Sequence, residues 1–149
     1  MMKDLKYPQE IISSIAQDID MGMISFINTD TMEYDSVPGE YCGDLESYDN
    51  DDVFREVLDK IDNWEHLIRI DPPESRQSFR IMEQFIENCI PDNDTLKNRL
   101  WDALVRRKPF RNFKFMIDNS EYRQRWFDFK QTELEQLVLE QLSYGGGRG

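Results

Sequence analysis

MISFINTDTMEYDSV, at residues 23–37, is the stretch of the chain that decides its fold class. Two β-prone runs, residues 23–27 and 32–37, flank the sequence Asn-Thr-Asp-Thr at residues 28–31. Asparagine and aspartate favour turns because their side chains bond to nearby backbone groups. The stretch therefore predicts a β-hairpin, which the Pro-Gly pair at residues 38–39 ends.

On both sides of the hairpin, apolar residues recur at helical spacing. A helix is predicted before it, with one apolar face made by Ile11, Ile12, Ile15, Ala16 and Ile19. After it, the run Leu67–Ile70 predicts a short strand. The remaining apolar stripes predict helices over about residues 53–61, 73–89, 96–104, 109–117 and 121–142.

The order of these elements indicates the fold class. Strands cluster in the first half of the chain, helices dominate the second, and the two do not alternate as βαβ units. This order predicts an α+β fold, in which a small antiparallel sheet of about three strands is packed by about six helices. A length of 149 residues with 39% hydrophobic residues fits one domain, expected over residues 1–143. Residues 144–149 are expected to be a flexible glycine-rich tail.

The net charge of −12 is unevenly distributed. Residues 1–66 hold 4 basic and 17 acidic side chains, whereas residues 67–149 hold 14 and 13. Within residues 104–125, seven side chains are basic and two are acidic. Such an asymmetry indicates either a basic binding patch or attraction between the two halves of the chain.

Composition also predicts the compartment. No apolar run approaches the ~20 residues that cross a bilayer, and the first residues lack the apolar core of a signal peptide. Cys42 and Cys89 stand far apart, without the spacing of a metal site. We therefore expect a cytoplasmic protein without a disulfide and without membrane association.

Signatures of catalysis or metal binding are absent from the sequence. His66 is the only histidine, and a general base needs an oriented partner and a nucleophile in reach. The acidic clusters at residues 49–52 and 92–94 lack the ligand spacing and central glycine of a calcium-binding EF-hand. Helix capping explains both clusters. No metal, cofactor or catalytic residue is predicted, and the sequence leaves open whether the protein is an enzyme.

The most informative segment is RRKPFRNFKF, at residues 106–115, which interleaves cations with aromatic residues. Phe110 and Phe113 lie three apart, so we expect both to face inward and the cations to face solvent. The segment predicts a small binding or regulatory module, whose binding residues are Arg106, Arg107, Lys108, Arg111 and Lys114. An acidic protein partner is favoured over nucleic acid, because the acidic half of the chain repels a duplex. Two structural interpretations also remain open: a solvated helix face, or a basic face docked on the acidic half.

Two other hypotheses remain open. A small hydrolase or transferase could assemble a site near residues 66–75, from His66, Arg69, Asp71, Ser75 and Arg111. Alternatively, a structural protein could associate with a copy of itself through Leu134, Leu137 and Leu142. Oligomeric state and partner do not follow from the sequence.

Four motifs occur in order along the chain: RIDPPES at residues 69–75, MEQFI at 82–86, PFRNFK at 109–114 and WFDF at 126–129. In this series the chain resembles a bacterial uncharacterised protein family, UPF0158. The resemblance implies a bacterial, cytoplasmic protein and supplies no reaction, cofactor or catalytic residue. Pro109 departs from the family pattern, in which small residues usually precede the first phenylalanine of the basic segment.

Overall fold

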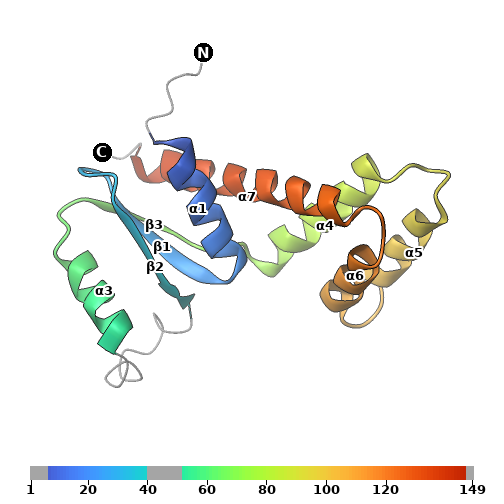
Figure 1. The fold of residues 1–149 in the computed structure, drawn as a ribbon, viewed down its shortest axis with the longest axis horizontal. Helices are drawn as coiled ribbons and strands as arrows, with labels where there is room; N and C mark the ends of the chain where they lie inside the picture. Colours follow the sequence, from blue (N-terminus) through green and yellow to red (C-terminus); the bar gives the residue numbers. More distant parts are fainter. Residues whose placement is uncertain (1–6, 40–51, 147–149) are drawn as a thin grey trace, which may run out of the picture. The chain divides into compact units, whose positions relative to one another are not determined.

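The structure, a computed structural model, describes residues 7–39 and 52–146. Within them, six helices and three strands follow one another along the chain (Figure 1). They are α1 (Gln9–Asp20), β1 (Met23–Asn28), β2 (Tyr34–Pro38), α3 (Asp52–Asp62), β3 (Leu67–Ile70), α4 (Ser75–Cys89), α5 (Thr95–Leu104), α6 (Pro109–Asp118) and α7 (Arg123–Gly146). The predicted α+β class, with a three-stranded antiparallel sheet, is confirmed.

The chain divides into two compact units. Unit 1 comprises Met1–Pro73 and Leu134–Gly149, and unit 2 comprises Glu74–Glu133. One domain over residues 1–143 stays a prediction, because a division by packing does not decide whether the units fold separately.

The sheet belongs to unit 1 and has β1 at its centre, paired antiparallel with β2 on one edge and β3 on the other. The register places Ile27 opposite Tyr34 of β2 and opposite Ile68 of β3. The predicted hairpin is confirmed, but β2 begins at Tyr34 rather than Met32. Met32 has a φ of 68°, and its N–H donates to the carbonyl oxygen of Asn28 at 2.7 Å. Met32 therefore belongs to the turn.

The core of unit 1 combines α1, the sheet and the C-terminal part of α7. Leu134 and Leu142 are only 2% and 3% exposed there, and Leu137 packs against the same core. The self-association hypothesis required these three leucines to be buried against a second copy. The structure buries Leu134 and Leu142 within unit 1 instead.

The core of unit 2 combines α4, α5, α6 and the first part of α7. Phe85 of α4 and Phe113 of α6 are fully buried. Both meet the ring of Trp126 edge to face, with centroids 5.2 Å and 4.9 Å from it. Aromatic pairs favour this geometry, so Trp126 ties α4, α6 and α7 together.

Helix α4 begins at Ser75 rather than at the predicted Pro73. Residue 72 precedes a proline and is therefore biased toward an extended backbone. Glu74 becomes the residue before the helix, and its N–H donates to Oε1 of Gln77 at 2.8 Å. This bond satisfies one of the N–H groups near the helix start.

Helix α7 begins at Arg123, two residues after the predicted Glu121, because the N–H of Tyr122 turns back to Oγ of Ser120 at 3.1 Å. It continues to Gly146, into the predicted tail. Residues 147–149 lie outside the described part of the chain. No helix over the described residues is long and apolar enough to cross a membrane.

Candidate functional site

The candidate site lies on unit 2, around the turn that joins α5 to α6. Helix α5 ends at Leu104 and α6 starts at Pro109, whose fixed φ suits the first position of a helix. Nδ2 of Asn112 donates to the carbonyl oxygen of Arg107 at 2.9 Å. The N–H of Asn112 donates to the carbonyl oxygen of Lys108 at 3.1 Å. The turn is thus fastened to the start of α6.

The start of α6 is positively charged and has no capping side chain. Lys108, the residue before the helix, has a φ of 55° in the left-handed region. Its ammonium group cannot accept a hydrogen bond from the free N–H groups of the first turn. Those N–H groups already give a helix start a partial positive charge. Arg107, Lys108 and Arg111 add three full charges at the same end, an arrangement that favours a bound anion.

The five predicted cations are all exposed, but they divide into paired and unpaired residues. Nε of Arg106 donates to Oδ2 of Asp102 at 2.6 Å, and Nζ of Lys114 donates to Oδ2 of Asp118 at 3.0 Å. The other three form no ion pair with an acidic side chain among the described residues; they are Arg107, Lys108 and Arg111. Among the five predicted cations, the three unpaired ones therefore lie together at the turn and the start of α6.

The aromatic residues of α6 lie on two sides of the helix. Phe113 is buried as predicted, but the prediction that Phe110 faces inward is wrong: its side chain is 42% exposed. The Phe110 ring meets the Phe79 ring edge to face at 6.3 Å, at the margin of the core. Phe115 is 69% exposed. It follows the buried Phe113 by two positions and therefore lies on the opposite side of the helix.

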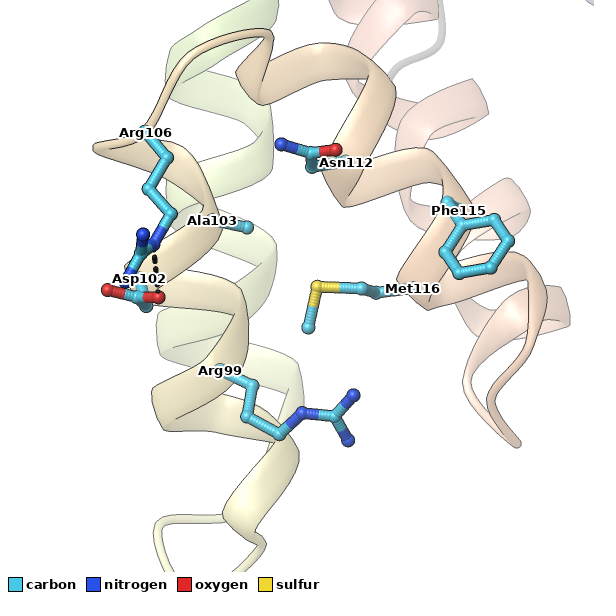
Figure 2. Close-up of a pocket in the computed structure, with 7 residues that line it drawn as sticks. All are labelled: Arg99, Asp102, Ala103, Arg106, Asn112, Phe115 and Met116. Atoms are coloured by element: carbon cyan, nitrogen blue, oxygen red, sulfur yellow. Dashed lines mark hydrogen bonds and ion pairs between the residues drawn. The ribbon is translucent and has the colours of Figure 1, made fainter.

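A groove of about 260 Å³ separates α5 from α6 (Figure 2). Met116 points from α6 toward α5, and Arg99 extends from α5 beside it. A second hollow of about 350 Å³ shares Arg99, Phe115 and Met116 with the first and continues to Tyr122. The residues around the first groove are Arg99, Asp102, Ala103, Arg106, Asn112, Phe115 and Met116.

Of the five predicted cations, only Arg106 lines this groove. Arg99 was not predicted as a site residue. Like the unpaired cations of the turn, it is exposed and forms no ion pair with a described acidic side chain. Its position follows from the packing of α5 on α6, which no local pattern in the sequence reports.

The five residues of the hydrolase or transferase hypothesis fall in both units. His66, Arg69 and Asp71 belong to unit 1, whereas Ser75 and Arg111 belong to unit 2. Within unit 1, Nε of Arg69 donates to Oδ1 of Asp71 at 2.8 Å, in an exposed ion pair.

His66 has a partner that the sequence does not indicate. Its Nδ1 lies 3.0 Å from Oδ2 of Asp30 in the hairpin turn, and this hydrogen bond raises the pKa of His66. Its carbonyl oxygen accepts the N–H of Thr29 at 3.1 Å, which joins the two segments. Asp30, Glu65 and His66 bring three potential metal-ligating atoms within 4.8 Å of one another, all on exposed side chains.

The structure gives Asp94 two hydrogen-bond partners and partly buries Cys89. Asp94 caps α5, since its side chain accepts a hydrogen bond from the N–H of Leu96 at 2.9 Å. It also accepts a hydrogen bond from the hydroxyl of Tyr122 at 2.6 Å. Burial raises the pKa of the Cys89 thiol, which disfavours the reactive thiolate. Cys42 and residues 49–51 lie outside the described residues.

Comparison with known proteins identifies the family of the chain. The model of the uncharacterised protein family (UPF0158) matches residues 22–145, from the start of the hairpin almost to the end of α7. The chain belongs to this family. The resemblance carried by the four sequence motifs is thereby confirmed. No curated protein and no solved structure matches this UPF0158 chain. Membership in this uncharacterised family assigns no function to the chain.

Proposed function

We propose that this UPF0158 chain is a protein-binding module, whose surface at the α5–α6 turn holds an acidic segment of a partner protein. One observation carries the proposal. Arg107, Lys108 and Arg111 gather at the start of α6 and pair with no acidic side chain of the described residues. The alternative interpretation, a solvated helix face, explains their exposure but not their position at the positive end of a helix.

The energetics of the helix start favour an anionic ligand. Positive side chains near a helix N-terminus oppose the helix dipole, at a cost of roughly 0.3–1 kcal/mol each when exposed. A carboxylate bound at the turn would offset this repulsion and accept hydrogen bonds from the first N–H groups of α6. Arg107 and Arg111 can each bind a carboxylate through two N–H groups, whereas Lys108 supplies a point charge.

The distribution of charge favours a protein segment over a long nucleic acid. Of the 18 basic and 30 acidic side chains, unit 2 holds 12 and 10, so its net charge is +2, whereas that of unit 1 is −14. Over distances beyond the Debye length of about 8 Å at physiological salt, such fields are largely screened. A short acidic segment therefore experiences mainly the local cations, whereas binding of a long nucleic acid is opposed by the net negative charge of the chain.

A matched pair of charge reversals tests the proposal. The test variant is Arg107→Glu with Arg111→Glu; the control is Arg76→Glu with Arg80→Glu, on two exposed arginines of α4 in the same unit. Both variants change the net charge equally. Glutamate near the start of α6 agrees with the helix dipole, so we expect the test variant to fold, and circular dichroism checks this.

Each variant is used to capture partners from bacterial lysate, with and without nuclease, followed by quantitative mass spectrometry. We expect an acidic protein that is enriched by the wild type and by the control variant, and lost with the test variant. Capture that disappears on nuclease treatment would indicate nucleic acid instead. Equal capture by the test and control variants would contradict the proposal.

A further inference from the structure

We infer that the groove between α5 and α6 binds an apolar side chain of the same acidic segment, so the ligand is an acidic peptide with one aliphatic or aromatic anchor. This inference rests on the proposed function and adds to it a second contact. Charge alone would accept any acidic surface, whereas an anchor pocket selects among acidic sequences.

The groove begins where the cationic turn ends. Asn112 lines the groove, and its Nδ2 donates to the carbonyl oxygen of Arg107 at 2.9 Å. Arg106, the neighbour of Arg107 in the turn, lines the groove as well. A peptide whose acidic residues contact the turn therefore has its neighbouring side chains beside the groove opening.

The lining of the groove suits an apolar group. Ala103 is buried at its side, Met116 is half-buried, and Phe115 leaves 69% of its side chain exposed to water. Covering an exposed phenylalanine removes apolar surface from water, which stabilises a complex. Methionine adapts its flexible side chain to different partners and is common at peptide-binding surfaces. The one ion pair of the groove, between Arg106 and Asp102 at 2.6 Å, lies at one side in Figure 2.

The size of the groove favours a single side chain. Pockets for small molecules and cofactors usually measure about 300–1,000 Å³, and this groove measures about 260 Å³. An anchor residue whose backbone stays outside fits such a volume.

Positive charge on both sides of the groove favours acidic residues on both sides of the anchor. Arg99 lies on α5, and the unpaired cations of the turn follow the helix end at Leu104. The preferred ligand therefore has an acidic residue on each side of its apolar anchor.

Fluorescence anisotropy with two labelled peptides tests this inference. Both peptides are runs of glutamate; one has a central leucine and the other a central alanine. Burial of a leucine side chain changes affinity by about tenfold or more, so we expect the wild type to bind the leucine peptide at least tenfold more tightly. Phe115→Ala removes an exposed side chain, so the fold should be retained. We expect it to lower the preference for leucine to less than threefold, because the leucine peptide loses more affinity than the alanine peptide.

Two further variants separate the two contacts. Phe110→Ala deletes an exposed aromatic residue of α6 that does not line the groove, and we expect the preference for leucine to persist. Arg107→Glu with Arg111→Glu should weaken both peptides equally. Equal affinity of the wild type for the two peptides, or loss of the preference in Phe110→Ala but not in Phe115→Ala, would overturn the inference and leave the proposed function standing. Binding of neither peptide, or binding that ignores the arginines, would overturn the proposed function as well.

Discussion

Lys108 combines an unfavourable backbone conformation with a charge of the candidate site, and substitution can separate the two. Its φ of 55° is a conformation that glycine adopts readily and other residues rarely adopt. Lys108→Gly and Lys108→Ala both remove the ammonium group. The difference in stability between these two variants therefore reports the backbone alone.

The expected magnitude follows from two opposing terms. The left-handed conformation costs a non-glycine residue roughly 1–2 kcal/mol. Glycine avoids this cost but loses more conformational freedom on folding than alanine, by roughly 0.5–1 kcal/mol. We expect the free energy of unfolding of Lys108→Gly to exceed that of Lys108→Ala by about 1 kcal/mol.

Urea unfolding followed by circular dichroism and tryptophan fluorescence measures this difference. The two signals should give the same midpoint if the chain unfolds in one step. Both variants should also lose affinity for the acidic peptides to the same extent, since they lose the same charge. A Lys108→Ala variant as stable as Lys108→Gly would refute the account of strain at this residue.

Two titrations test the electrostatics of single groups. His66 is the only histidine, so a single imidazole resonance reports its titration in NMR. The hydrogen bond to Asp30 raises the pKa of His66. We expect Asp30→Asn to lower that pKa toward its ordinary value. The pKa of His66 is higher in the folded chain than in the unfolded chain. The ion pair with Asp30 therefore stabilises the fold below the unfolded-state pKa, and this stabilisation is lost as pH rises through the folded-state pKa. The hydrogen bond from Tyr122 to Asp94 raises the pKa of Tyr122 to about 12. In an absorbance titration of the tyrosines we expect one ionisation near pH 12, which Asp94→Asn shifts downward; an unchanged titration would contradict the assignment.

The sequence predicts helices and strands well where the deciding signal lies within a few neighbouring residues. The strand Leu67–Ile70 has its predicted ends, and α6 starts at the predicted Pro109, because apolar spacing and proline act within a few residues. The start of α4 was predicted less accurately. There a contact of Glu74 with Gln77 determines the start, in competition with the prolines before it.

The sequence cannot predict features that depend on packing between distant segments. The pairing of β1 with β3 brings together residues about 40 positions apart, and only this pairing places Asp30 beside His66. The groove between α5 and α6 likewise requires both helices in place. By contrast, the ion pairs of Arg106 and Lys114 with aspartates four residues away follow a helical spacing that is readable in the sequence.

The course of α7 has a consequence for the order in which the protein can fold during synthesis. The first part of this helix belongs to the core of unit 2, and its later residues, including Leu134, Val138 and Leu142, complete the core of unit 1. A ribosome makes α1 and the sheet first, but their apolar partners from α7 only after all of unit 2. The N-terminal segment therefore leaves the ribosome with an incomplete core, and the later-made unit 2 can finish its packing earlier, the reverse of the usual N-terminal-first order.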